Sequence, residues 1–235
     1  LTDRVLKSGK TYVVVVRLSP DVDDATLAAA LTELKGEILN VPPKQSAVKI
    51  RVRTRTLHEV DVHEREGRYV VISISCAAGT YIRTWARDLG LLLGTPVGLI
   101  ELRRTHSGHF SEDSTVTMQQ LADAVWLWQV KEDPTALERV LRPVEELLVG
   151  IPRVFVKDGA AAAVCHGAPL LRPGVIAIDH GLANGDEVRL LTLKGEAVAL
   201  ARMQVDGARL AEMKTGEVAK SSTVLMEVDT YPRGW

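Results

Sequence analysis

Apolar positions divide the first part of the chain into strands and helices. Residues 11–18 are almost continuously apolar and rich in valine, which is typical of a strand buried on both faces. Residues 23–34 begin with aspartates suited to a helix N-terminus and continue with leucines at helical spacing, and Gly36 follows them. We therefore expect a central strand and then an amphipathic helix.

The pattern continues with two strands and three helices. We place strands at residues 47–57 and 69–76, and helices at residues 81–93, 118–130 and 134–148. Pro42 and Pro43 interrupt the chain before the strand at residues 47–57. Gly79 makes the turn between the strand at residues 69–76 and the helix that follows it. Basic residues occupy every second position near the start of the first strand and would share one of its faces: Lys49, Arg51, Arg53 and Arg55.

The sequence changes character near residue 150. An alanine-rich helix at residues 159–165 is surrounded by short apolar runs, which glycines punctuate at regular intervals. Short strands of even spacing with glycine-rich turns are typical of a small closed or half-closed β-domain. We therefore expect two domains, residues 1–150 and 151–235.

Composition places the chain among ordinary globular proteins. Of its 235 residues, 46% are hydrophobic and 25% charged, and no apolar run approaches the roughly 18 residues that span a bilayer. The formal net charge of -1 argues against a protein that coats nucleic acid without specificity, so any RNA site has to be local. Cys76 and Cys165 lie far apart in apolar surroundings, which favours a reducing, intracellular setting.

The sequence does not contain the residue patterns that several kinds of catalytic or binding site require. Ser73 and Ser75 have no Gly-x-Ser-x-Gly elbow of a serine hydrolase. The histidines have no metal-site spacing with a third ligand nearby, so we interpret them as solvated loop residues: His58, His63, His106 and His109. No glycine-rich loop has the lysine or spacing that cradles phosphates, so we expect neither a metal nor a nucleotide cofactor.

Two features are more suggestive. Residues 79–84 (GTYIRT) bring an aromatic ring and a guanidinium to the start of a helix, where they could stack a base and hold an anion. Taken without further context, such residues are more often core packing and a surface ion pair. Cationic positions recur around this motif and either line a groove along a phosphate backbone or protect a strand edge. They are the four basic strand residues, Arg83, Arg87, Arg103, Arg104 and His106.

These motifs occur together in a known family. In content and order, four segments resemble the TruB and dyskerin pseudouridine synthases: residues 8–12 (SGKTY), 42–49 (PPKQSAVK), 79–84 (GTYIRT) and 101–105 (ELRRT). Later segments resemble the PUA half of dyskerin homologues: residues 156–158 (VKD), 165–168 (CHGA), 193–199 (LKGEAVA) and 231–235 (YPRGW). The resemblance implies an α+β fold, with a mixed, largely antiparallel pseudouridine-synthase sheet and helices followed by a small β-barrel PUA domain.

Within the family, the chain resembles most an archaeal dyskerin homologue, the catalytic subunit of the H/ACA ribonucleoprotein. The resemblance implies isomerisation of uridine to pseudouridine in rRNA or in the tRNA T-loop. The implied partners are H/ACA guide RNA, rRNA, tRNA and the small proteins of that particle, without a cofactor, a metal or a membrane. An archaeal member would be cytoplasmic, and a eukaryotic one nucleolar.

The resemblance also implies residue roles. Tyr12 matches the tyrosine that packs on the target base, Leu102 an apolar residue of the base pocket, and Tyr81 and Arg83 the motif whose arginine pairs with the catalytic aspartate. Lys49 matches a motif lysine that supports the structure or contacts the backbone. The other expected RNA contacts are Arg51, Arg53, Arg103, Arg104, His166, Gly167 and Lys194.

The sequence lacks one residue that the resemblance implies, the family's nucleophile. It is an aspartate in a Gly-x-Leu-Asp-Pro-like loop upstream of the tyrosine strand, whereas Asp3 lies too close to Tyr12 and Asp88 has a helical context. We expect an N-terminally incomplete synthase that binds RNA without isomerising uridine. The alternatives are a non-catalytic RNA-binding scaffold, and a metabolic enzyme with an added β-domain, for which there is no cofactor motif.

Overall fold

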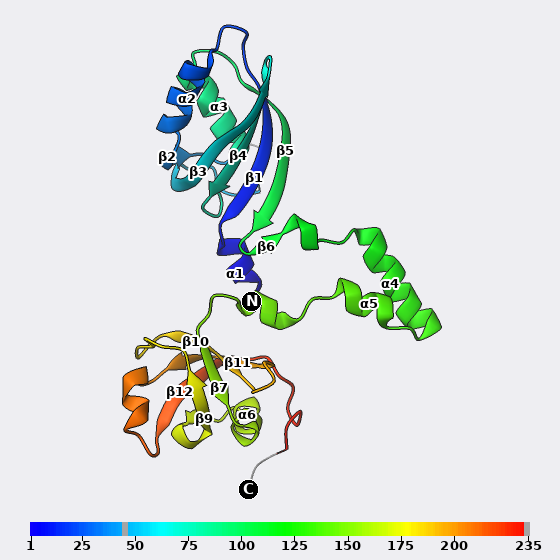
Figure 1. The fold of residues 1–235 in the computed structure, drawn as a ribbon, viewed down its shortest axis with the longest axis vertical. Helices are drawn as coiled ribbons and strands as arrows, with labels where there is room; N and C mark the ends of the chain where they lie inside the picture. The colour runs from blue at the N-terminus through cyan, green and yellow to red at the C-terminus, as the bar shows by residue number, and fades with distance from the viewer. Residues whose placement is uncertain (44–46, 233–235) are drawn as a thin grey trace. The chain divides into compact units, whose positions relative to one another are not determined.

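The computed structural model describes residues 1–43 and 47–232, which divide into two compact units, Leu1–Glu132 and Asp133–Trp235 (Figure 1). Residues 44–46 of the PPKQSAVK motif and residues 233–235 of the YPRGW motif lie outside the described residues. The domain boundary expected near residue 150, which rests on the change in sequence character, remains a prediction.

The first unit is built on a six-stranded antiparallel sheet in the order β2-β3-β4-β1-β5-β6. Its strands are β1 Lys10–Arg17, β2 Gly36–Asn40, β3 Arg53–Glu66, β4 Tyr69–Cys76, β5 Gly98–Ser107 and β6 Phe110–Ser111. The valine-rich strand β1 pairs with β4 on one side and β5 on the other. Its predicted interior position is confirmed.

Two helices cover one face of this sheet, α2 Asp24–Glu33 and α3 Ile82–Leu92 (Figure 1). The Asp23 side chain accepts a hydrogen bond from the Thr26 amide and so caps α2, as the acidic start of the pattern predicted. Trp85 of α3 is fully buried against apolar residues of β1 and β4 in the core between the layers. The helices predicted at residues 23–34 and 81–93 are therefore confirmed.

The remaining helices of the first unit are α1 Thr2–Lys7, the 3₁₀ turn η1 Glu112–Ser114 and α4 Met118–Lys131. A capping box at Thr117 and Gln120 begins α4, since each side chain bonds the other residue's backbone amide. No helix in the described part of the chain combines the length and apolar character needed to cross a bilayer.

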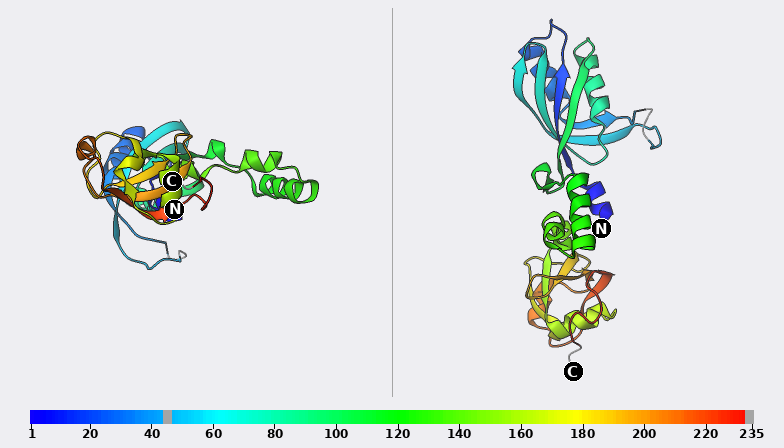
Figure 2. Two further views of the ribbon diagram at one scale, coloured as in Figure 1. Left: turned by 90° about the horizontal axis from the view of Figure 1, so that it is seen from below. Right: turned by 90° about the vertical axis from the view of Figure 1, so that its right-hand side faces the viewer.

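Three sequence-based expectations are wrong. The four histidines expected in loops are exposed, but His58 and His63 lie on β3 and His106 on β5, and of the four only His109 lies in a turn. The strand predicted at residues 47–57 begins only at Arg53. Its partner β2 ends opposite it at Asn40, and residues 47–52 have no partner strand among residues 1–43 and 47–232 (Figure 2). Lys49 and Arg51 therefore do not share a strand face with Arg53. The helix predicted at residues 134–148 is broken into α5 Thr135–Val140 and the 3₁₀ helix η2 Val144–Leu148, because Pro143 lies between them.

The second unit contains the predicted small β-domain. Its six strands follow the order β8-β12-β11-β10-β7-β9 and curve round a common interior (Figure 2). They are β7 Arg153–Val156, β8 Leu170–Leu171, β9 Val175–Ile178, β10 Glu187–Leu191, β11 Ala197–Met203 and β12 Glu217–Val224, with helix α6 Asp158–Cys165 and the 3₁₀ helices η3 Arg172–Gly174 and η4 Gly207–Ala211. The α+β fold class is thus confirmed.

Candidate functional site

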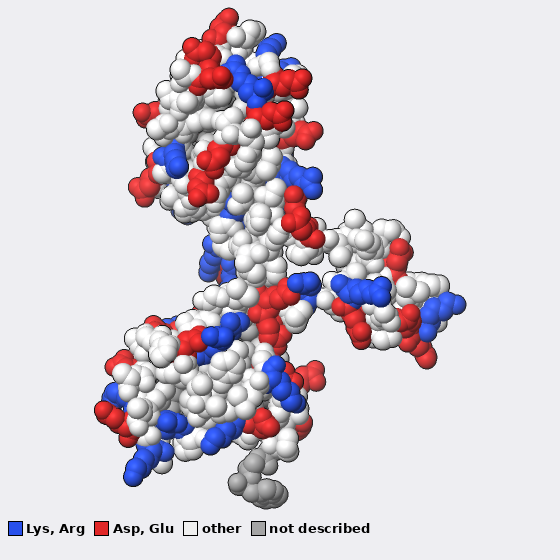
Figure 3. Space-filling view, viewed as in Figure 1, with Lys and Arg blue, Asp and Glu red and all other residues white. Residues whose placement is uncertain are grey.

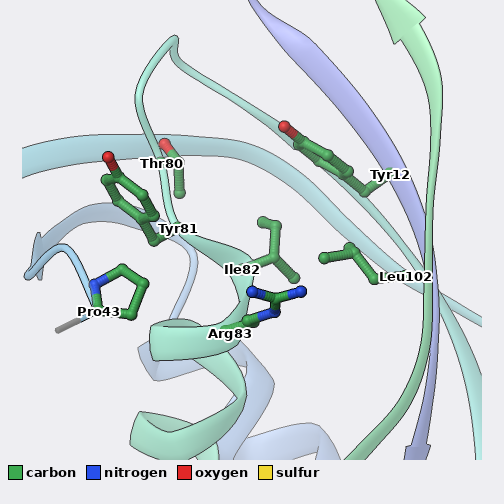
Figure 4. A pocket seen from close by; sticks show the side chains of 7 residues that line it. All are labelled: Tyr12, Pro43, Thr80, Tyr81, Ile82, Arg83 and Leu102. Atoms are coloured by element: carbon green, nitrogen blue, oxygen red, sulfur yellow. The ribbon is translucent and has the colours of Figure 1, made fainter. Parts of the chain in front are cut away.

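A pocket of about 280 Å³ opens at the start of α3. It is lined by Tyr12, Pro43, Thr80, Tyr81, Ile82, Arg83 and Leu102. Tyr12 and Leu102 come from the neighbouring strands β1 and β5 and form one wall, while Tyr81 and Pro43 lie across from them (Figure 4). The structure therefore brings together four residues that the resemblance singled out from distant parts of the chain.

Tyr12 presents an aromatic ring from a strand that cannot easily move. The strand is hydrogen-bonded on both sides, and the neighbouring residues on the same face, Val14 and Val16, are fully buried. Burial, reinforced by the Cys76 thiol, raises the pKa of the Tyr12 hydroxyl, and the facing Arg104 opposes this rise. The ring is therefore neutral at physiological pH and suited to stacking on a base.

Glycine makes the turn that carries Tyr81 possible. Gly79 has φ of +75°, a left-handed conformation that other residues adopt at a cost. The Thr80 hydroxyl donates to the Ala77 carbonyl at 2.7 Å, and Arg55 Nε donates to the Gly79 carbonyl at 3.2 Å. Arg55, expected to extend a basic RNA-facing stripe, thus bonds to this turn.

A second set of contacts comes from the end of β2. The Asn40 amide group accepts from the Tyr81 N–H at 2.9 Å and donates to the Tyr81 carbonyl at 3.2 Å, and the Thr84 hydroxyl donates to the Val41 carbonyl at 2.7 Å. No sequence motif predicted a role for either the Asn40 or the Thr84 side chain. A signal existed, because Asn40 shares a strand face with the apolar Ile38, where a buried polar group needs a specific partner.

Arg83 is the cation of the pocket. It lies in the first turn of α3, and its guanidinium points into the space between the two walls (Figure 4). None of the seven lining residues is acidic, and within residues 1–43 and 47–232 Arg83 has no carboxylate at ion-pair distance. The pocket thus has a cation and aromatic walls without a carboxylate from the described part of the chain.

The aspartates weighed as nucleophiles have other partners. Asp88 follows Arg87 on α3 and bonds its guanidinium at 2.8 Å. Asp3 pairs with Lys7 along α1 at 3.3 Å. Neither carboxylate lines the pocket.

The expected RNA-contact residues of the first unit do not form one stripe. Arg104 follows Leu102 on the pocket side of β5, while Arg103 points to the opposite face and bonds Glu112 at 2.6 Å. Arg53 faces Asn40 across the β2–β3 pair. On the face drawn in Figure 3, basic and acidic residues are interspersed, as the near-zero net charge suggests. Their RNA contacts remain predictions.

The expected RNA-contact residues of the second unit lie at its turns. His166 and Gly167 end α6, and His166 Nε2 lies 3.2 Å from Asp229 Oδ1. Lys194 occupies the β10–β11 turn, with its ammonium 5.2 Å from the centre of the Tyr231 ring. The Tyr231 hydroxyl bonds Glu196, so these contacts anchor the segment after β12.

Comparison with known proteins agrees with both halves of the resemblance. Residues 83–149 match the family "tRNA pseudouridylate synthase B C-terminal domain", and residues 152–225 match the family "PUA domain". A relative named "Probable tRNA pseudouridine synthase B", from Pyrobaculum calidifontis, is 42% identical over 229 residues, which are 97% of this chain and 69% of the relative.

Solved structures match over nearly the whole chain. One is an H/ACA RNP bound to a substrate RNA containing 2'-deoxyuridine, with a TM-score of 0.84, 34% identity, and coverage of 99% of this chain and 71% of that chain. Another is the archaeal box H/ACA sRNP Nop10-Cbf5 complex, with a TM-score of 0.79, 35% identity and the same coverages.

The fold and these matches define a pseudouridine synthase unit joined to a PUA domain. The chain belongs to the TruB-type pseudouridine synthase family and is a homologue of archaeal Cbf5, the dyskerin counterpart. The resemblance seen in the motifs is confirmed.

Proposed function

We propose that this chain forms the base pocket of an RNA pseudouridine synthase and isomerises uridine to pseudouridine together with a nucleophilic aspartate. The observation that carries the proposal is the grouping of Tyr12, Tyr81 and Leu102 around the Arg83 guanidinium in one pocket. Such a site offers aromatic and apolar surface to a base that has left its stack, and a cation to an anionic partner.

The reaction determines the role of each group. The bond between ribose C1′ and uracil N1 breaks, the base rotates, and C1′ joins C5; C5 then loses its proton and N1 gains one, so no oxidant or cofactor is consumed. A carboxylate nucleophile starts such a sequence, and Arg83 would keep it ionised and oriented. Tyr12 would stack on the base, and Leu102 would help to keep the detached uracil enclosed.

The proposal extends to RNA and protein partners. We take H/ACA guide RNA as the element that selects uridine in rRNA, with tRNA as a second substrate, and small proteins of that particle as partners. His166, Gly167 and Lys194 of the PUA unit would hold the guide, and Lys49, Arg51, Arg53, Arg103 and Arg104 would contact the phosphate backbone. The proposed compartment is the cytoplasm of an archaeon.

A chimera tests the proposal, because the described pocket contains no carboxylate. The part of the Pyrobaculum calidifontis relative that precedes its region of similarity to this chain would be joined to the chain. The chimera would be incubated with guide RNA, partner proteins and a uridine-containing substrate. Pseudouridine would be measured by mass spectrometry of the digested RNA. We expect product from the chimera and none from the 235-residue chain under the same conditions.

Two controls make the result specific to the pocket. Arg83→Met in the chimera should abolish product, because the carboxylate loses its cationic partner, while Arg87→Met should not, because Arg87 already pairs with Asp88. A folded chimera that binds substrate RNA and forms no pseudouridine would instead support the non-catalytic scaffold.

A further inference from the structure

Asn40 is an almost fully buried polar side chain beside the pocket, with 1% of its surface exposed. Its amide bonds both backbone polar groups of Tyr81, accepting from the N–H and donating to the carbonyl. Tyr81 precedes the first residue of α3, and its backbone is extended (φ -100°, ψ 103°). One side chain therefore fixes the backbone from which a pocket wall projects.

The same two segments are tied together a second time. Thr84, in the first turn of α3 and 5% exposed, donates to the carbonyl of Val41, the residue after Asn40. Pro43, two residues further on, lines the pocket on the Tyr81 side (Figure 4). The end of β2 thus sets the relative placement of Tyr81 and Pro43.

We propose that Asn40 is a positioning residue, which acts through Tyr81 to hold that wall of the pocket in the geometry that receives the base. This inference rests on the proposed function. Asn40 does not line the pocket itself, and its side-chain hydrogen bonds go to the Tyr81 backbone, so Tyr81 is the lining residue through which it acts directly. Asparagine suits the position because it offers one acceptor and one donor, whereas an ionised aspartate offers acceptors only.

The test compares two RNA hairpins that differ at a single unpaired loop position, which carries either uridine or an abasic site. Their dissociation constants for the 235-residue chain would be measured by fluorescence anisotropy at one salt concentration. For the wild-type chain, the ratio of the abasic to the uridine constant should be about tenfold, as expected when one base stacks on aromatic side chains. In Asn40→Ala, the ratio should fall to near one, with the abasic constant unchanged.

The conservative variant Asn40→Asp gives a pH-dependent result that a loss of stability by itself would not produce. In Asn40→Asp, the ionised carboxylate places an oxygen against the Tyr81 carbonyl, whereas the protonated carboxyl can donate to it. The uridine preference of Asn40→Asp should therefore return as the pH is lowered, while that of Asn40→Ala stays near one at every pH. Leu31→Ala, a buried change on α2 outside these contacts, should lower stability and keep the wild-type ratio.

The outcomes separate the inference from the proposed function. A wild-type ratio near one overturns the proposed base pocket, and the inference with it. A clear wild-type ratio that Asn40→Ala retains overturns only the role of Asn40. If Leu31→Ala loses the ratio as well, general destabilisation explains the effect and the positioning role is refuted.

Discussion

Replacement of Gly79 by alanine should damage the turn that carries Tyr81. At φ of +75°, a Cβ would lie 3.2 Å from the Arg55 Nη2 atom, closer than most Cβ contacts in proteins. The left-handed backbone alone costs a non-glycine residue about 1–2 kcal/mol. Displacing Arg55 from the Gly79 carbonyl adds roughly 1 kcal/mol, the ordinary contribution of one hydrogen bond. We expect a total loss of about 2–3 kcal/mol from the first unit.

Gly67 offers a matched control for this prediction. It also has a positive φ, +55°, but a Cβ there would meet nothing within 4 Å. Gly67→Ala should therefore show only the backbone cost of about 1–2 kcal/mol. The comparison of the two variants isolates the contribution of the Arg55 contact.

Urea unfolding followed by tryptophan fluorescence measures both variants. Of the described tryptophans, Trp85 is fully buried in the core of the first unit, whereas Trp126 and Trp128 are half exposed. The change in emission on unfolding therefore comes mainly from Trp85 and reports the unfolding of that unit. The uridine preference of the two hairpins, measured in parallel, should fall in Gly79→Ala and remain in Gly67→Ala. Equal losses of stability with an unchanged preference in both variants would refute the assigned role of the Gly79 turn.

Three further predictions concern the pocket, the segment before β3 and the PUA unit. Tyr12→Phe should retain the uridine preference in the hairpin assay and Tyr12→Ala should lose it, because stacking uses the ring; loss in both would contradict this role. Lys49→Gln should weaken both hairpins equally and reduce the slope of log affinity against log salt by about one, if Lys49 contacts a phosphate; an unchanged slope would argue against that contact. Arg153 lowers the pKa of Asp179 through hydrogen bonds, so the associated stability is present above the ordinary carboxyl pKa of about 4 and is lost as the pH falls through the lower folded value. Thermal unfolding of the PUA unit across that range should show the loss. Arg153→Met should make the loss smaller without abolishing it, because the Arg153 backbone N–H still donates to the Asp179 carboxylate at 2.8 Å.

Local patterns predicted much of the secondary structure. The valine-rich run of β1 and the leucine spacing of α2 depend on residues near one another in sequence, so period and end signals were enough to place them. The same reasoning failed at residues 47–52, because a strand forms only where a partner offers hydrogen bonds and β2 ends too early to do so. The helix predicted at residues 134–148 is also interrupted at Pro143, although a proline can be recognised from the sequence alone.

Some features of the candidate site could likewise be predicted from the sequence, and others could not. The sequence by itself determined the residue types of the pocket, because Tyr12, Tyr81, Arg83 and Leu102 lie in motifs that the family shares, and it determined that Gly79 allows the turn. Only the tertiary structure decided that Asn40 and Arg55 hold that turn and that Arg103 faces away from the pocket. The reason is that hydrogen bonds such as Asn40 to Tyr81 join residues 41 positions apart. The pairing of β2 with β3 and of β3 with β4, together with the packing of α3 on the sheet, brings such residues together.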